Sequence, residues 1–290
     1  MLAVLAGTVA PVFAIALLGA WMRSRMVFDP PAISRLALYL LSPALIFSGI
    51  SQTEASPREL GRVALGVVAL VVVLYVLGLG VAAVTRMPAS TRAGYLLSTV
   101  FMNSGNYGLP LVLFAFGEEG FAIGVMYFVT QSFLTNTVGA YVASRGVSSG
   151  RQAISKALRV PALYAALLAL PFPLFGLELP ETVLRPVELL GRAAIPLLLL
   201  LLGAQLRLHV RAAHGAVTAA ALVTRLVISP LLALGVARVL DFGPLSTLVF
   251  VLESGMPTAV LTLVLSMEFD ADTELLAGVV AYSTILSVVT

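Results

Sequence analysis

The chain has 290 residues, of which 60% are hydrophobic and only 11% are charged, whereas a soluble domain carries about 25% charged residues. This composition excludes a soluble protein and predicts an all-α integral membrane protein. The formal net charge of +3 comes from short basic loops without a long basic run, so we expect no nucleic-acid partner. Cysteine is absent, which excludes disulfides and thiolate metal sites.

Ten segments are long and apolar enough to cross a membrane as helices, for which about 20 residues are needed. No basic residue precedes the first apolar segment, so we expect a retained span and not a cleaved signal peptide. The ten expected spans are residues 2–22, 33–50, 61–84, 92–116, 120–143, 157–176, 183–204, 213–238, 244–267 and 272–290.

Basic residues indicate the orientation of these spans, because cytoplasmic loops are rich in Lys and Arg. Eleven basic residues lie in the connections after odd-numbered spans, and five lie on the other side. We therefore expect the odd-numbered connections in the cytoplasm and both termini outside, in a multi-pass protein of the cell (inner) membrane. The eleven residues are Arg23, Arg25, Arg35, Arg86, Arg92, Arg145, Arg151, Lys156, Arg159, Arg207 and Arg211.

The most polar of these connections, residues 144–157, separates five spans from five spans. An odd number of spans in each half inserts the second half in the opposite orientation, which is the pattern of an inverted repeat. We therefore expect one membrane domain made of two repeats, residues 1–145 and 157–290. Faint similarity between residues 42–49 and residues 195–203 supports the division, although two leucine-rich segments can match by chance.

Helix breakers and amides interrupt the fourth span at Asn103–Pro110. Irregular backbone inside a bilayer must line a protein cavity. The helix that restarts after the break presents free N–H groups and its positive end. The sequence therefore predicts a site for an anionic group, and a simple kink whose amides bond to freed carbonyls is the alternative. The expected contributors are Asn103, Gly105, Asn106, Tyr107 and Pro110.

A second interruption, Glu253–Pro257, lies in the ninth span. Gly255 supplies a turn, and Pro257 suits the first position of a new half-helix. Two broken helices in corresponding halves indicate the binding site of a secondary transporter. We therefore expect the two breaks to meet at one sheltered site.

Glu253 is the only acidic residue well inside an expected span, and burying an unpaired carboxylate is costly. It must bind a cation, hold a proton or pair with an arginine. A bound Na⁺, with Ser254 and Asn103 as further candidate ligands, or a proton would couple transport to that ion. A salt bridge with Arg225 would be structural instead.

Arg225 is the one deep basic residue, within the eighth span. Its guanidinium group has the geometry to hold a substrate carboxylate with two N–H groups. Pairing with Glu253 and extension toward the membrane surface are the alternatives.

The fifth span carries a polar stripe of Tyr127, Gln131 and Thr135 at intervals of four, with Asn136 beside it. Polar side chains at this density face the helix bundle or a cavity, so Gln131 and Asn136 are candidate substrate contacts. Hydrogen bonding between helices is the alternative. No nucleophile–base constellation accompanies these residues, so we expect no enzymatic activity and no cofactor beyond a coupling ion.

These residues resemble bacterial members of the auxin efflux carrier family, over essentially the whole chain. The resemblance implies ten helices in two inverted repeats of five, with broken fourth and ninth helices that cross at the midplane. It also implies scaffold helices 1, 2, 6 and 7, which often mediate dimers, and transport helices 3–5 and 8–10. The matching elements are Asn103–Pro110, Ile195-Pro196 with the leucine run to Gly203, Met256-Pro257-Thr258-Ala259 and Tyr282-Ser283-Thr284-Ile285-Leu286-Ser287.

The resemblance further implies transport of organic anions, which are auxin in plants and dicarboxylates such as malate or malonate in bacteria. Glu253 is a departure, because many members have a small apolar residue there. In this respect the chain is similar to the bile-acid sodium symporters, which share the general fold, and Na⁺ coupling is favoured. The resemblance assigns the first crossover to Asn103, Asn106 and Pro110, the second to Pro257 with Met256 beside it, and a substrate contact to Gln131.

The expected function is therefore a secondary active transporter that moves a small organic anion across the bilayer by alternating access, coupled to Na⁺ or H⁺. The alternatives are a Na⁺-dependent symporter of larger organic anions of the bile-acid type and a membrane sensor that does not transport. The expected partners are the anion, the lipid bilayer and a second copy of the chain in a homodimer.

Overall fold

The computed structural model describes residues 7, 9–25, 29–144, 158, 160–205 and 214–288. Within these ranges the regular structure is entirely helical, without strands. The helices, with short π-helical segments marked η, are α2 (Ala10–Arg25), α3 (Pro30–Leu36), η2 (Ala37–Leu41), α4 (Ser42–Ser51), α5 (Pro57–Val84), α6 (Ala89–Val100), η3 (Ser104–Gly108), α7 (Leu109–Leu134), η4 (Thr135–Gly139), α8 (Ala140–Ala143), α10 (Pro161–Ala169), α11 (Pro171–Phe175), α12 (Glu181–Gln205), α13 (Gly215–Val223), η5 (Thr224–Ile228), α14 (Ser229–Val239), α15 (Pro244–Ser254), α16 (Val260–Glu268) and α17 (Thr273–Leu286).

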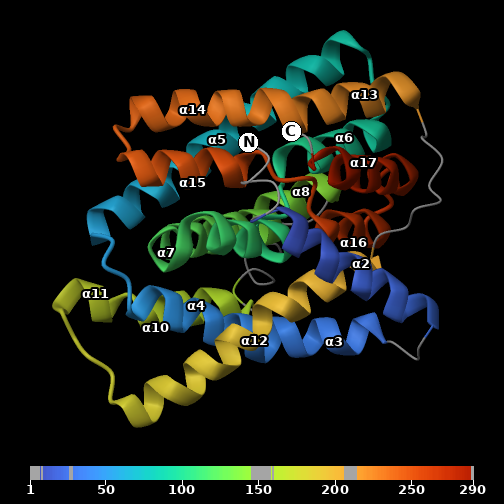
Figure 1. The fold of residues 1–290 in the computed structure, drawn as a ribbon. Helices are drawn as coiled ribbons and strands as arrows, with labels where there is room; N and C mark the ends of the chain where they lie inside the picture. The colour runs from blue at the N-terminus through green and yellow to red at the C-terminus, as the bar shows by residue number, and fades with distance from the viewer. Residues whose placement is uncertain are drawn as a thin grey trace.

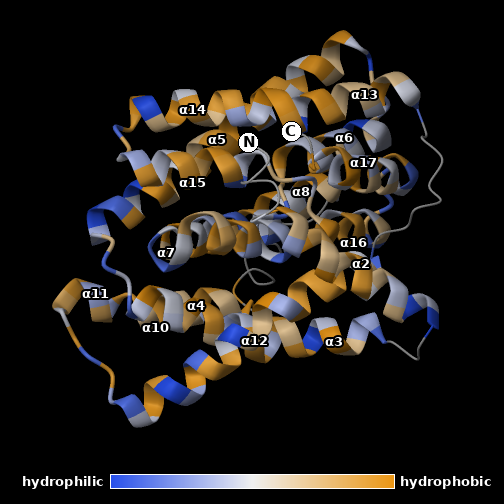
Figure 2. Cartoon of the chain, viewed as in Figure 1, coloured by the Kyte–Doolittle hydropathy of each residue, from blue (hydrophilic) through white to orange (hydrophobic). Residues whose placement is uncertain are grey.

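Five of the described helical segments are long and apolar enough to cross a membrane. Large hydrophobic side chains cover the outer face of α5, where Val76 is 61% exposed and Val84 is 85% exposed. Figure 2 shows hydrophobic residues along most of α5 and α14, with hydrophilic residues gathered at helix ends. These features are those of an integral membrane protein. The five segments are Pro30–Ser51, Pro57–Val84, Ser104–Ala143, Glu181–Gln205 and Gly215–Val239.

The predicted count of ten spans and the inverted repeat stay predictions. Most of the connection that would divide the repeats, residues 145–157, lies outside the described residues, as do Arg159, Arg207 and Arg211. The predicted boundary between the fourth and fifth spans coincides with Gly117, which has φ of 66° and ψ of −162° inside α7. These dihedral angles are not helical, so α7 is two helices joined at Gly117. Only glycine adopts this backbone conformation readily.

One group of helices is built around α12, which packs against α2 and α4, while α4 also packs against α10. These helices occupy the lower part of Figure 1, and α5, α6, α14, α15 and α17 occupy the upper part. Helix α7 lies between, in contact with α4 on one side and with α5 and α15 on the other. The lower group contains the first, second, sixth and seventh predicted spans, and its role as a scaffold remains a prediction.

Glycine allows α2 and α12 to approach closely. A Cβ atom on Gly203 would overlap the backbone of Ala16, and one on Gly19 would overlap the backbone of Leu200. Small residues at such crossings let helix backbones come into direct van der Waals contact inside a membrane. This crossing therefore joins the first predicted span firmly to the seventh.

The Gly203→Ala variant should unfold at a lower temperature than the parent, because its methyl group forces α2 away from α12. Overpacking of this kind costs about 1–3 kcal/mol of stability. In chains of about 150–250 residues, each kcal/mol lowers the unfolding temperature by about 2–4 °C. The matched control is Gly80→Ala in α5, where nothing lies within 4 Å of the added methyl. Thermal unfolding in detergent measures both, and an equal effect of the two substitutions would contradict the close crossing.

Candidate functional site

The two predicted interruptions are confirmed. Helix α6 ends at Val100 and η3 begins at Ser104, while α15 ends at Ser254 and α16 begins at Val260. At the first interruption the backbone becomes extended directly after α6, with φ of −113° and ψ of 115° at Phe101. Each interrupted helix therefore exposes a carboxyl end and a new amino end inside the protein.

The two interruptions pair with each other. Met102 and Thr258 form an isolated antiparallel bridge. The Asn103 N–H donates to the Pro257 carbonyl at 2.7 Å, and the Ala259 N–H donates to the Phe101 carbonyl at 3.0 Å. Backbone groups that leave a helix inside a membrane protein need such partners. The pairing supplies them and fixes the two breaks side by side.

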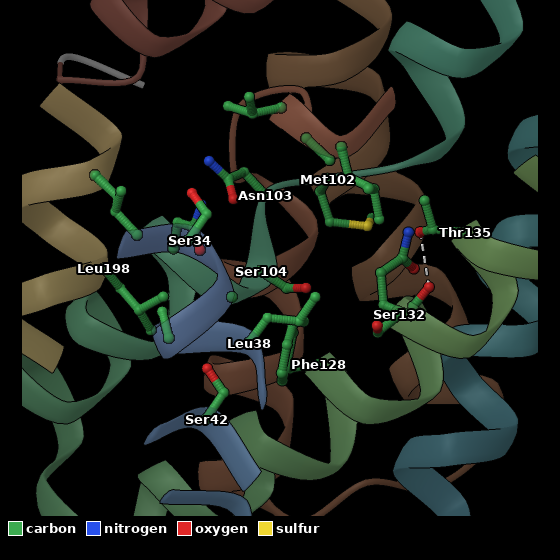
Figure 3. Close-up of a pocket in the computed structure, with 18 of the residues that line it drawn as sticks. Ser34, Leu38, Ser42, Met102, Asn103, Ser104, Phe128, Ser132, Thr135 and Leu198 are labelled. Carbon is green, nitrogen blue, oxygen red and sulfur yellow. Dashed lines mark hydrogen bonds between the residues drawn. The ribbon is translucent and has the colours of Figure 1, made fainter. Parts of the chain in front are cut away.

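A cavity of about 270 Å³ lies next to these breaks. Figure 3 shows Asn103 near Ser34 of α3, with Ser132 and Thr135 on the side opposite Leu198 of α12. None of the described residues that line the cavity is charged. They are Ser34, Ala37, Leu38, Ser42, Met102, Asn103, Ser104, Gly105, Asn106, Phe128, Gln131, Ser132, Thr135, Leu198, Leu201, Gln205, Ala259, Val260, Leu261 and Val264.

Two new helical segments begin at this cavity. Residues 104–106, which open η3, and Val260 and Leu261, which open α16, are all part of its lining. The first N–H groups of a helix have no acceptor within that helix, and its start carries a partial positive charge. The cavity therefore receives two positive helix ends without a charged side chain.

Three amide side chains on the cavity wall have buried atoms without hydrogen-bond partners in the described part of the chain. These atoms are Nδ2 of Asn103, both Oε1 and Nε2 of Gln131, and Oε1 of Gln205. Asn103 is 6% exposed and Gln131 is 1% exposed. Native proteins rarely leave buried polar atoms unpaired, because each costs about 1–3 kcal/mol. Their collection on one wall is the pattern of a binding site whose partner is a ligand.

Of the predicted substrate residues, Asn103, Gly105, Asn106 and Gln131 are brought together on the cavity wall. Gln205, Ser34 and Ser42 were missed by sequence reasoning. Polar residues near the end of an expected span are ordinary, and only the facing of α12 and α3–α4 reveals their position.

The other predicted residues lie outside the cavity lining. The Asn136 side chain donates to the Ser132 carbonyl of its own helix at 2.8 Å. Tyr107 is buried, and its hydroxyl accepts from Ser287 at 3.2 Å. Pro257 contributes its carbonyl to the paired breaks. Pro110 and Met256 are buried and are not part of the cavity lining.

Glu253 is fully buried, and neither carboxylate oxygen has a hydrogen-bond partner among the described residues. Its side chain packs against Gly108 of the first break, where a Cβ atom would overlap the carboxylate. Gly124 of α7 is a further neighbour, and a Cβ atom there would lie 3.5 Å from Glu253 Oε1, in ordinary van der Waals contact. The missing Cβ atom of Gly108 therefore makes the space for this acid. Next to it, the Ser254 hydroxyl is 3.0 Å from the Tyr127 hydroxyl.

Arg225 is also fully buried, but it lies outside the cavity lining. It donates to the Thr99 carbonyl at 2.8 Å, to the Ser254 carbonyl and to the Ser229 hydroxyl. No ion pair joins Arg225 to Glu253 within the described residues. The two buried ionisable side chains thus occupy separate positions around the breaks.

Sequence comparison places this architecture in a family. The chain matches the family described as "Membrane transport protein" over residues 4–147 and 143–290. The chain belongs to this family. It is the family of the auxin efflux carriers, so the resemblance seen in the sequence is confirmed.

The chain is similar to two archaeal proteins over most of its length. A protein of Methanothermobacter thermautotrophicus, described as an uncharacterized transporter, is 31% identical over 272 residues, which are 90% of this chain and 86% of the relative. A protein of Methanocaldococcus jannaschii with the same description is 28% identical over 268 residues, which are 88% of this chain and 85% of the relative.

The Gly108→Ala variant of this transport-family protein should be destabilised by about 1–3 kcal/mol, because its methyl group overlaps the Glu253 carboxylate. Combining it with Glu253→Ala removes the overlap, so the double variant should lose less than the sum of the single losses. Apparent unfolding temperatures of the four proteins measure this coupling. Additivity within about 0.5 kcal/mol would show that Glu253 does not lie against Gly108.

Proposed function

We propose that the protein is a secondary active transporter that moves a small organic anion across the membrane by alternating access. The family and both relatives are transporters, which are not enzymes. The observation that carries the anion assignment is the cavity wall on which Asn103 and Gln131 lie beside two helix starts, with amide atoms that have no partner among the described residues.

The chemistry of this wall suits a carboxylate. Amide N–H groups and free backbone N–H groups donate hydrogen bonds, and helix starts favour negative charge. The Gln131 and Gln205 oxygens can accept from a hydroxyl or from a protonated group of the same ligand. A volume of about 270 Å³ accommodates a small molecule and lies just below the usual range of ligand pockets, about 300–1,000 Å³.

The position of the cavity supports alternating access. Its walls come from α3, η2, α4 and α12 on one side and from η3, α7 and α16 on the other. A ligand held there contacts both helix groups. Motion of one group against the other therefore changes the side of the membrane from which the ligand is accessible. In this proposal the α12 group is the scaffold, and it also carries the surface for a homodimer.

The membrane arrangement proposed with this function has ten spans in two inverted repeats, with the crossover at the midplane. The protein then lies in the cell (inner) membrane with both termini outside, as the distribution of basic residues predicts. A membrane sensor that binds the anion without moving it is the competing class. Counterflow of a labelled anion separates the two, because a sensor gives none.

The Asn103→Ala variant should lose at least about 90% of anion uptake in proteoliposomes, since a hydrogen bond to a charged ligand contributes about 1.5–3 kcal/mol. Its folded yield should stay close to that of the parent, because the buried Nδ2 atom of Asn103 makes no hydrogen bond with the described residues that the substitution could remove. The control is Thr130→Ala on α7, because Thr130 lies outside the cavity lining and its hydroxyl donates to the Met126 carbonyl of its own helix. Undiminished uptake by Asn103→Ala would contradict the site.

A second proposal is that transport is coupled to Na⁺ or H⁺ through Glu253. The support is a fully buried carboxylate without a partner in the described residues, in contact with the first break at Gly108. Such a group needs a cation or a proton. Binding there stabilises the packing of α15 on the first break, and so connects the ion to the shape of the anion cavity. A Na⁺-dependent carrier of larger, bile-acid-type anions is the variant of this proposal.

The Glu253→Gln variant should lose the dependence of transport on Na⁺ or on pH that the parent shows, because glutamine has no charge to balance and no proton to exchange. Uptake of labelled anion is measured across Na⁺ gradients and pH gradients for both proteins. Identical ion responses of parent and variant would assign Glu253 a structural role only.

A further inference from the structure

Arg225 has a position that neither the anion site nor the ion site uses. It lies in η5, the π-helical segment between α13 and α14, and its side chain is 0% exposed. A buried guanidinium group is tolerated only when other groups satisfy its charge and donors. π-Helical turns are rare and often occur at functional positions. The partners of Arg225 therefore indicate its role.

Those partners are the carboxyl ends of both interrupted helices. Thr99 is in the last turn of α6, and its carbonyl accepts from Nη1 of Arg225 at 2.8 Å. Ser254 is the last residue of α15, and its carbonyl accepts from Nη2. The same carbonyl accepts from the Ser229 hydroxyl at 2.7 Å. Carbonyls in the last turn of a helix have no partner in that helix and carry its partial negative charge.

We propose that Arg225 is a positioning residue that fastens the two broken helices together by their negative ends. One planar cation reaches carbonyls of both helices, and a fork of N–H groups is suited to this in a way that a lysine is not. The negative ends are thereby neutralised, and the positive starts of η3 and α16 remain free for the cavity. The consequence for anion transport rests on the proposed function, whereas the fastening itself does not.

The contacts oppose the roles of substrate ligand and of ion-pair partner for Arg225, and its complete burial opposes extension toward the membrane surface. It does not line the cavity, and Nη1 and Nη2 already have acceptors, so little remains for a substrate carboxylate. Nε alone has no partner among the described residues. Glu253 is not its ion-pair partner in the described part of the chain. The fastening role accounts for both occupied nitrogens.

An engineered disulfide between the two breaks can replace the contacts of Arg225. The chain has no cysteine of its own, so two introduced cysteines can pair only with each other within the molecule. Met102 and Thr258 face each other in the antiparallel bridge, with the hydrogen bonds on the flanking residues. Such a pair has Cα atoms about 4.5 Å apart, within the range that a disulfide requires. The parent for the test is therefore the Met102→Cys/Thr258→Cys protein, which can be oxidised or reduced.

In this parent, Arg225→Gln should slow formation of the 102–258 disulfide by about tenfold, the factor expected when hydrogen bonds to a charged group are lost. Arg225→Lys should slow it less. Arg238→Gln, an exposed arginine on the adjoining α14, should leave it unchanged. Should Arg225→Gln fail to fold, Ser229→Ala removes one bond to the Ser254 carbonyl and should give a smaller slowing. An unchanged rate in Arg225→Gln, or in Ser229→Ala when that variant is used, overturns the proposal.

Transport provides the second readout. Reduced Arg225→Gln should transport poorly, and oxidation should restore it to within about threefold of the oxidised parent, because the disulfide supplies what a few hydrogen bonds supplied. A folded, oxidised Arg225→Gln protein that stays inactive beside an active oxidised parent contradicts the proposal. If no protein in the series transports the test anion, the proposed function fails, and the disulfide rates alone decide the role of Arg225.

Discussion

Backbone pairing at the two interruptions is the constraint on which the rest of this structure depends. Lipid offers no partner to an N–H or carbonyl group, so a helix can unwind inside a membrane protein only where other protein groups receive those atoms. Here the backbone of each break pairs with the backbone of the other at the bridge between Met102 and Thr258. Thr258 adds a bond from its hydroxyl to the Ser98 carbonyl at 2.7 Å. The pairing makes one unit of two segments that are about 150 residues apart in the chain.

The two sides of this unit differ in electrostatic character, because each helix has a negative carboxyl end and a positive amino end. The carboxyl ends of α6 and α15 meet Arg225, while the starts of η3 and α16 meet the cavity. The negative helix ends thus bind a fixed cation, and the positive ends border a cavity whose amides have no partner among the described residues. The same electrostatic rule accounts for a buried arginine and for the proposed anion site, whose described lining has no charged residue. Glu253 adds a buried acid beside the first break, in space that Gly108 provides.

Much of this organisation could be predicted from the sequence. Breakers inside apolar segments predicted both interruptions, and the polar stripe predicted Gln131. The sequence could not predict Gln205 as a wall residue or the position of Asn136, because the facing of a helix depends on how it packs. The partners of Arg225 were hidden for a stronger reason. They are backbone carbonyls, which every residue has, so no side-chain pattern could single out Thr99 and Ser254.

The most direct measurement is a cryo-EM map of the protein in lipid nanodiscs with its tightest-binding anion, selected by thermal stabilisation. The account predicts ligand density between the Asn103 amide and the first turn of α16, with Met102 and Thr258 still opposed. Ligand density elsewhere, or a map in which either broken helix is continuous or the two breaks lie apart, would contradict it.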